Sequence, residues 1–285
     1  MSGLTPKIVA FATQKGGVGK TMTCWNIAGV LAKHGKKVLA IDLDPQSNLT
    51  SNFGLDNTEL FPANNKPYGA CQIFNTSNGA ITDPKDVDIN SVIIKSPLDE
   101  IMPNVDLIPS HLFLSKADTN LSQIAFKEKT LNRFLEYYKS IINEYDYILI
   151  DTAPNMFPVN QNAFLTADSI VLLADPSIHS IDGMDMFIDT WSQVSKVAGI
   201  EFNINTIILN NVDMRSKQQE KFYSYCENNE LLNAMLLDTF IPQAIELRNT
   251  EVNSIPIIFN EESKNKALRD RYEQIVKELE EREVL

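Results

Sequence analysis

Short apolar runs recur along the 285-residue chain and alternate with longer stretches of mixed polarity. Each run has the length of a β-strand, and several are apolar throughout, without the alternation of a half-exposed strand. This pattern is typical of parallel strands that are buried on both faces of a sheet. The runs predict strands at residues 7–13, 37–43, 105–109, 147–152, 169–174, 205–210 and 238–241.

The stretches between these runs have the spacing of helices, and Gly35 is placed to end the first of them. Helices are predicted at residues 20–34, 127–143, 182–197 and 216–228, with a final helix at about 261–282. Regular alternation of strands and helices predicts an α/β fold: a doubly wound, mostly parallel sheet flanked by helices.

Residues 52–99 are rich in Asn, Pro, Asp and Ser and carry no clear periodicity. We interpret this segment as an insertion of loops and short helices over one edge of the sheet. No linker separates two compositionally different halves, and 44% of the residues are hydrophobic. Residues 1–285 are therefore predicted to form a single domain around one core.

Composition limits the possible locations and partners. The formal net charge of −12 weighs against a strong, constitutive hold on nucleic acid, although it leaves room for a local basic patch. The three cysteines form no CxxC pair, which favours a reducing compartment and argues against zinc or iron–sulfur sites. No run approaches the roughly 18 apolar residues of a membrane span. The first apolar strand begins at residue 7, which leaves no room for a signal peptide before it. A cytoplasmic protein without a membrane anchor is expected.

Residues 14–21, Gln-Lys-Gly-Gly-Val-Gly-Lys-Thr, join the first predicted strand to the first predicted helix. Glycines let backbone N–H groups curl around phosphate oxygens, and the helix N-terminus adds its positive dipole end. In such a loop Lys20 bridges the β- and γ-phosphates, and Thr21 offers its hydroxyl to Mg²⁺. The alternative is a glycine-rich turn with two solvated lysines.

Gln14 stands where the strict phosphate-loop pattern has its first glycine, and a second lysine, Lys15, follows it. This string resembles the deviant Walker A signature of the ParA/MinD superfamily of P-loop ATPases. The resemblance implies an ATP- and Mg²⁺-dependent homodimer in which Lys15 reaches the phosphates of the partner's ATP. A cation that arrives in trans stabilises charge on the transferring phosphoryl group. The implied nucleotide-binding residues are Lys15, Gly16, Gly17, Val18, Gly19, Lys20, Thr21 and Met22, of which Lys15 and Lys20 are also catalytic.

Carboxylates follow two of the predicted strands, at the sheet edge where ligands bind in doubly wound folds. Alternation sends Asp42 and Asp44 to the same side, although an Asp-Pro turn with capping residues is the alternative. Their segment resembles the family's first switch, which implies that Asp44 activates the hydrolytic water and that Asp42 supports the metal shell. Asp151 ends a Walker B-like strand and is predicted to hold Mg²⁺, unless it only caps a buried strand. Residues 151–155 resemble the second switch.

Two further segments resemble the family's adenine-binding end. Asn210 closes a predicted strand where relatives place a side chain against the base, and Pro242 falls where they place a proline. An ordinary capping asparagine and a strand-end turn are the alternatives at these two positions.

The C-terminal third distinguishes between branches of the superfamily. Residues 241–250, followed by Ser254-Ile255-Pro256, resemble a stretch of chromosomal and plasmid ParA/Soj proteins, here in a short form without an N-terminal helix-turn-helix domain. The last helix has an acidic polar side, which an anionic bilayer would repel. Its apolar stripe is expected to pack on the body of the protein. The stripe consists of Tyr272, Ile275, Val276 and Leu279.

The resemblance also implies nonspecific DNA binding in the ATP state, but Gln243 and Glu246 stand where relatives often carry arginines. Other basic residues could form a patch, or could lie on solvated helix faces. The candidates are Arg215, Lys217, Lys221, Arg248, Lys264, Lys266, Arg269 and Arg271.

Together these features predict a nucleotide-gated switch for plasmid or chromosome partitioning. The resemblance implies a ParB-like centromere-binding partner that stimulates slow ATP hydrolysis, and a cytoplasmic protein that associates with the nucleoid when ATP is bound. Three alternatives remain: an ATPase of the same fold that positions a protein cargo, a metabolic enzyme that phosphorylates or ligates a small acid, and a regulator that barely hydrolyses ATP.

Overall fold

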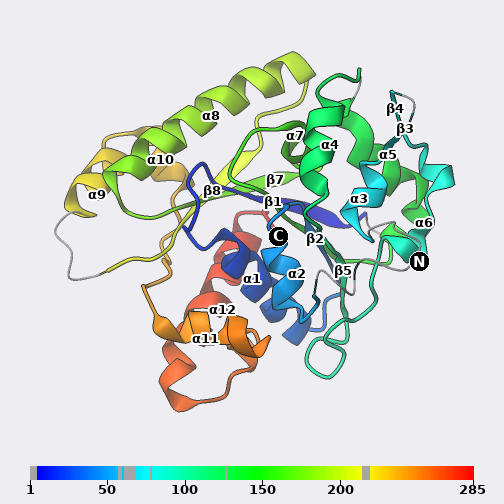
Figure 1. Cartoon of the computed structure of the whole chain (residues 1–285). Helices are drawn as coiled ribbons and strands as arrows, with labels where there is room; N and C mark the ends of the chain where they lie inside the picture. The colour runs from blue at the N-terminus through cyan, green and yellow to red at the C-terminus, as the bar shows by residue number, and fades with distance from the viewer. Residues whose placement is uncertain (1–4, 57–59, 61–67, 78, 126, 214–218) are drawn as a thin grey trace.

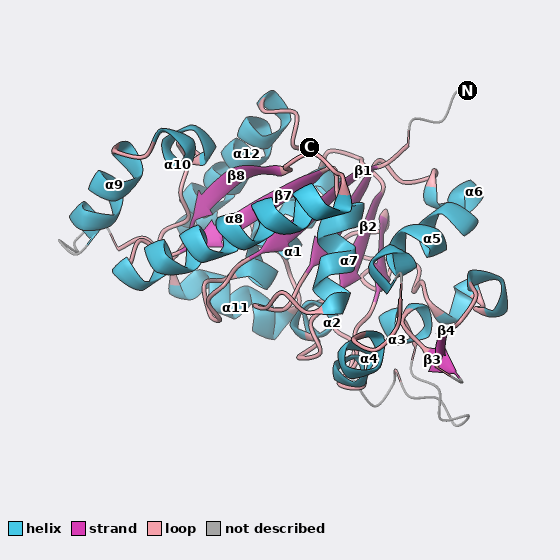
Figure 2. Ribbon diagram, turned by 90° about the horizontal axis from the view of Figure 1, so that it is seen from above, coloured by secondary structure: helices cyan, strands magenta, loops and turns pink. Residues whose placement is uncertain are grey.

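The computed structural model describes residues 5–56, 60, 68–77, 79–125, 127–213 and 219–285. Its centre is a six-stranded parallel sheet with the order β5-β2-β6-β1-β7-β8. Helices cover both faces of this sheet, so the predicted doubly wound α/β fold is confirmed (Figures 1 and 2). The strands are β1 (Lys7–Ala12), β2 (Val38–Asp42), β5 (Val105–Ile108), β6 (Tyr147–Asp151), β7 (Ser169–Ala174) and β8 (Ile204–Leu209).

The seventh predicted strand, at residues 238–241, is wrong. This segment runs beside β8, where Ile241 N–H donates to the Leu209 carbonyl at 2.8 Å. The backbone N–H of Thr239, however, donates to the Glu278 carboxylate at 3.2 Å, and Pro242 has no N–H to give. Because those groups do not join the ladder, only the isolated bridges of Leu236 with Ile207 and of Pro242 with Val212 form.

Two helical layers enclose the sheet. In Figure 1, α7 and α8 lie above the sheet, whereas α1, α11 and α12 lie below it. The upper layer contains α4 (Leu114–Leu121), α5 (Thr130–Tyr137), α6 (Lys139–Ile142), α7 (Pro158–Thr166) and α8 (Ile178–Ala198). The lower layer contains α1 (Lys20–Lys33), α2 (Asn48–Asn52), α11 (Ile245–Asn253) and α12 (Lys266–Glu281). Helices α9 (Gln219–Glu227) and α10 (Glu230–Met235) follow β8.

The first helix ends as its sequence predicts. Gly35 adopts the left-handed conformation with φ of +76°, and its N–H donates to the Ala32 carbonyl. The predicted helix at 127–143 is instead interrupted. A 3₁₀ turn (Lys127–Lys129) precedes α5, and Tyr138 separates α5 from α6. The Tyr138 hydroxyl bonds to carbonyls at Pro84 and Val87, which anchors the break against the preceding segment.

The described residues of the 52–99 segment that follow α2 lie at the β5 edge of the sheet (Figure 1). Ile94 forms an antiparallel bridge with Leu107 of β5, so this edge strand is partly covered. The described part contains α3 (Ala70–Ile73), the short antiparallel pair β3 (Thr76–Ser77) and β4 (Ala80–Ile81), and 3₁₀ turns at Pro84–Asp86 and Ile89–Ser91.

The C-terminal helix α12 packs through its apolar stripe, as expected. Tyr272, Ile275, Val276 and Leu279 are all buried in one cluster with residues of α1. Two 3₁₀ turns (Ile257–Phe259 and Ser263–Asn265) precede this helix. The described ranges contain no helix with the length and apolarity that a membrane crossing requires.

Candidate functional site

A cleft of about 1590 Å³ opens at the carboxyl ends of the central strands. The loop between β1 and α1 borders it on one side. Residues 44–52 form one wall, and residues 210–211 with the start of α11 form another. Residues 112–119 and 153–157 extend the cleft toward α4 and α7. Parallel strands converge at this edge, so side chains from distant parts of the sequence meet here.

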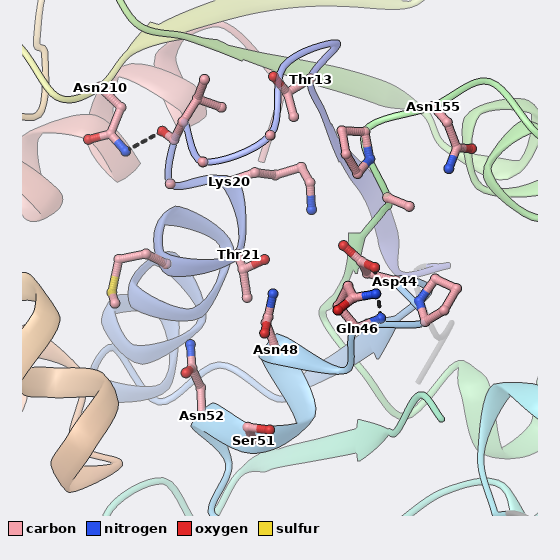
Figure 3. Close-up of a pocket in the computed structure, with 18 of the residues that line it drawn as sticks. Thr13, Lys20, Thr21, Asp44, Gln46, Asn48, Ser51, Asn52, Asn155 and Asn210 are labelled. Carbon is pink, nitrogen blue, oxygen red and sulfur yellow. Dashed lines mark hydrogen bonds between the residues drawn. The ribbon is translucent and has the colours of Figure 1, made fainter. Parts of the chain in front are cut away.

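The loop requires glycine at two positions. Gly17 and Gly19 have φ of +79° and +80°, which side-chain-bearing residues rarely adopt. A Cβ atom on Gly19 would also lie 2.1 Å from Asn210 Nδ2. That amide donates to the Val18 carbonyl at 2.7 Å, which is drawn in Figure 3, so Asn210 braces the loop from β8.

A buried ionic cluster, here called the floor, lies at the bottom of the cleft: Lys20 and Thr21 line the cleft, and the buried Asp151 lies behind them. The Lys20 ammonium donates to Asp151 Oδ1, and the Thr21 hydroxyl donates to Asp151 Oδ2 at 2.7 Å. Only 5% of the Lys20 side chain is exposed, and none of the Asp151 side chain is. In Figure 3, Lys20 and Thr21 both extend into the cleft, below the loop that arches over them. The predicted lysine and hydroxyl thus both lie within hydrogen-bonding distance of the predicted carboxylate.

Thr21 and Asp151 suit a magnesium ion held mainly by phosphate and water. Within the described residues, no group of three or more His, Cys, Asp or Glu side chains could hold a metal alone. Mg²⁺ usually takes one or two protein oxygens and completes its shell with water and phosphate oxygens. A hydroxyl and a carboxylate at the base of a phosphate-sized loop fit that donor set.

Asp42 and Asp44 lie differently, although both follow β2. Both carboxylate oxygens of Asp42 are occupied: Oδ1 accepts from Asp44 N–H at 3.0 Å, and Oδ2 accepts from the Thr50 N–H and hydroxyl at 2.9 and 2.7 Å. Asp42 is fully buried and does not line the cleft. Burial, with the neighbouring Asp151 charge, raises the pKa of Asp42 to about 7. In this arrangement Asp42 fixes the 43–50 segment.

Asp44 lines the cleft. Its Oδ1 accepts from the backbone N–H of Gln46 at 2.9 Å, an interaction drawn in Figure 3. Burial raises the pKa of Asp44, whereas the Gln46 hydrogen bond and the Lys20 charge oppose this shift. In Figure 3 Asp44 lies across the cleft from Lys20, and its water-activating role stays a prediction.

Lys15 does not line the cleft. Its ammonium pairs with Asp175 Oδ2 at 2.6 Å, just beyond the carboxyl end of β7, and 43% of its side chain is exposed. The two lysines of one loop therefore point to different places. Lys20 points to the buried floor, and Lys15 points to the outer rim of the cleft, by which we mean the Lys15–Asp175 pair.

The other predicted nucleotide contacts are only partly brought together. The Met22 side chain is buried, and its sulfur accepts from Asn26 on α1 and from Thr250 on α11. Asn210 lines the cleft, but its amide N–H bonds to the loop. Pro242 bridges to Val212 and does not line the cleft, whereas the adjacent Gln243 does.

The predicted basic residues form no single free patch in the described structure. Lys264 pairs with Glu262 and Lys266 with Asp270, and Arg269 donates to the carbonyls of Asn260 and Glu262. Arg271 donates to the Phe240 carbonyl and stacks 4.3 Å from its ring centroid. Lys221 is exposed on α9, and Arg248 lines the cleft. Arg215 and Lys217 lie outside the described residues.

Sequence reasoning missed three polar residues that organise the site. Asp175 follows β7, and the rule that identified Asp151 at the end of β6 would have identified it. Thr50 links Asp42 to the Ser110 N–H. Asn160 on α7 is buried and bonds to both Ala153 and Asn155, which holds the 153–155 segment. No sequence signal distinguishes Thr50 or Asn160 from ordinary polar residues.

Comparisons with known proteins identify relatives of this architecture. A family model described as an AAA domain matches residues 6–206. The sporulation initiation inhibitor protein Soj of Bacillus subtilis is 29% identical over 252 residues, which cover 88% of this chain and 90% of Soj. A plasmid partition protein of Borrelia burgdorferi, solved with AMPPNP bound, is 26% identical with a TM-score of 0.69, covering 95% of this chain and 98% of that one. The ATP complex of a Cyanothece McdA variant shares the fold, with 21% identity, a TM-score of 0.76 and 96% coverage of both chains.

Proposed function

Because the chain belongs to the AAA domain family and is a ParA/Soj-type P-loop ATPase, we propose that it is an ATP-dependent dimerising switch for plasmid or chromosome partitioning. In this proposal two protomers close face to face around ATP and Mg²⁺. The dimer binds DNA nonspecifically, and a ParB-like partner stimulates its slow hydrolysis. The protein would be cytoplasmic and would associate with the nucleoid while ATP is bound.

The main support for this proposal is that the two loop lysines point in different directions. Lys20 reaches the floor of its own cleft, whereas Lys15 leaves the same loop toward the rim and lies outside that cleft. A rim lysine is poorly placed for the phosphates of its own protomer but is accessible to a facing one. A cation that enters in trans would make hydrolysis depend on dimerisation.

Each residue of the cleft has a role in this mechanism. The N–H groups of the loop and of the α1 N-terminus would bind phosphate oxygens, and Lys20 would exchange Asp151 for the β- and γ-phosphates. Thr21 and Asp151 would hold Mg²⁺, which when bound neutralises charge on the phosphates. Asp44 would orient the attacking water, and Asp42 would hold the segment that carries Asp44. Asn210 would fix the loop, with Met22 and the backbone near Pro242 and Gln243 at the nucleoside end.

Nonspecific DNA binding is supported by the similarity to partition proteins more than by the charge of this chain. The Borrelia relative is a plasmid partition protein, but here Lys264 and Lys266 are paired with acidic side chains. Those pairings and the net charge of −12 favour, as a second candidate, a switch that positions a protein cargo.

The test is DNA binding at stated salt with ATP, with ADP and without nucleotide, for the wild type and Lys15→Gln. The proposal expects binding only with ATP and its loss in Lys15→Gln. ATP-dependent dimers without DNA binding would favour the protein-cargo candidate. Binding that does not depend on ATP, or that Lys15→Gln leaves intact, would contradict the switch.

A further inference from the structure

Asp175 lies at the turn between β7 and α8 and is not one of the residues that line the cleft. Its Oδ2 accepts from the Lys15 ammonium at 2.6 Å, across 160 positions of sequence. Its Oδ1 accepts from the Ser177 hydroxyl at 2.6 Å and from the Ser180 hydroxyl. The carboxylate therefore binds the signature lysine with one oxygen and the first turn of a 21-residue helix with the other.

The Lys15 backbone is fixed independently of this ion pair. Thr13, which is buried, accepts from the Lys15 N–H at 3.2 Å and donates to the Lys15 carbonyl at 3.1 Å. On the other side, a Cβ atom on Gly183 of α8 would lie 3.4 Å from the Gln14 Cβ, so α8 packs closely against the head of the loop. The side chain of Lys15 can thus change partners by rotation, without movement of the loop.

The carboxylate remains stabilised when the lysine leaves. Ser177, the N-cap of α8, and Ser180 keep their hydrogen bonds to Oδ1, and the helix dipole favours an anion at this end. Burial alone would raise the pKa of Asp175, but the bonds from Lys15, Ser177 and Ser180 outweigh burial and lower it. Release of Lys15 therefore does not strand an unpaired buried charge, so the cost of opening is small.

We propose that Asp175 is a positioning residue that holds Lys15 in cis in the single protomer and releases it when the ATP-bound dimer forms. The pair is half-exposed, with 43% of Lys15 and 21% of Asp175 accessible. A pair of this exposure changes an equilibrium by up to about fivefold. Because dimerisation opens two such pairs, Asp175 would weaken the dimer by up to about 25-fold. This inference rests on the proposed dimerising switch.

The first experiment measures the pair itself, without nucleotide. Lysines are acylated briefly with an N-hydroxysuccinimide ester, and each site is quantified by mass spectrometry against the exposed Lys85. Asp175→Asn is expected to raise Lys15 labelling by about two- to fivefold. Asp270→Asn is the matched control: it removes the exposed Lys266–Asp270 pair, so labelling should rise at Lys266 and stay constant at Lys15. Unchanged Lys15 labelling in Asp175→Asn would overturn the proposal.

The second experiment measures the consequence for assembly. Sedimentation velocity with ATP and Mg²⁺ is run on Asp44→Ala, in which hydrolysis is expected to be blocked, with and without Asp175→Asn. The dimer Kd is expected to fall by about 4- to 25-fold in the double variant, and Asp270→Asn should leave it constant. In a Lys15→Gln background, in which ATP-dependent assembly is expected to be lost, Asp175→Asn should not restore the dimer.

The outcomes separate the two proposals. A dimer whose Kd is the same or higher with Asp175→Asn overturns the cis-holding role but leaves the switch standing. No ATP-dependent dimer in the Asp44→Ala parent overturns the switch itself, and the role of Asp175 with it.

Discussion

The floor and the rim of the phosphate loop hold similar ion pairs in opposite surroundings. At the floor, Lys20 and Asp151 are almost entirely buried, and Thr21 completes their cluster. At the rim, Lys15 and Asp175 remain accessible to water. A buried pair cannot lose one partner without exposing the other to a low dielectric, whereas a water-accessible pair is screened and exchangeable. The floor pair can therefore open only when a bound nucleotide and Mg²⁺ supply replacement charges, whereas the rim pair can change partners without a buried ligand.

The largest effect on stability and ATP binding is expected from a substitution at the floor. Lys20→Met leaves the Asp151 carboxylate buried without its cation, which is expected to lower the free energy of unfolding by about 3–5 kcal/mol and to abolish ATP binding. Urea denaturation and nucleotide titration measure the two effects. Adding Asp151→Asn should recover part of the stability, though not the binding. A Lys20→Met protein as stable as wild type would show that the buried pair has no such role.

Asp44 tests the chemistry above the floor. Asp44→Ala is expected to lower the hydrolysis rate by about 10²- to 10⁴-fold while ATP binding and dimerisation remain. Burial raises the pKa of Asp44, so in the wild type its charged form is lost at a higher pH than for an ordinary aspartate. Hydrolysis should accordingly fall as the pH is lowered through that raised value. If Asp44→Ala hydrolysed ATP at the wild-type rate, the result would instead favour a regulator in which Asp44 has no catalytic role.

The two glycines with positive φ, Gly17 and Gly19, provide a matched pair of substitutions along the loop. Gly17→Ala meets no atom within 4 Å and should cost only its positive φ, about 1 kcal/mol. Gly19→Ala adds a clash with Asn210 Nδ2 and should cost about 1–3 kcal/mol more. Thermal unfolding of both variants measures the difference. Combining Gly19→Ala with Asn210→Ala should remove most of the excess, and equal costs for the two glycines would contradict the bracing role of Asn210.

The smallest effect is expected at the rim. Lys15→Gln should change the free energy of unfolding by less than about 1 kcal/mol, because the pair with Asp175 is accessible and screened. The folded-state pKa of Asp175 is lowered, so its contribution is present above about pH 4 and is lost as the pH falls further. Lys15→Gln should therefore be closest to wild type in stability at low pH. A loss comparable to that of Lys20→Met would erase the distinction between floor and rim.

The sequence predicts the central sheet and the floor well, because both follow from local signals. Apolar runs mark the six parallel strands, and the loop string places Lys20 and Thr21 at the start of α1. The false strand at residues 238–241 fails because its Thr239 N–H bonds to Glu278 of α12, a contact that no local pattern encodes. The bond of the Asn210 amide to the Val18 carbonyl is likewise a tertiary contact that no local pattern encodes, and the contact of Asn210 with the base stays a prediction. Asp175 itself could be found from its position after β7, but its pairing with Lys15, 160 positions away, could not.

The most direct test of the central claim mixes two inactive proteins. Lys15→Gln and Asp44→Ala are combined in equal amounts with ATP and Mg²⁺, and dimers in the mixture are verified by sedimentation. If Lys15 serves the partner's nucleotide, each mixed dimer contains one complete site, and hydrolysis should recover to at most roughly a quarter of the wild-type rate. If Lys15 serves its own nucleotide, no dimer in the mixture has a complete site. A mixture that forms mixed dimers but stays as inactive as either variant alone would contradict the account.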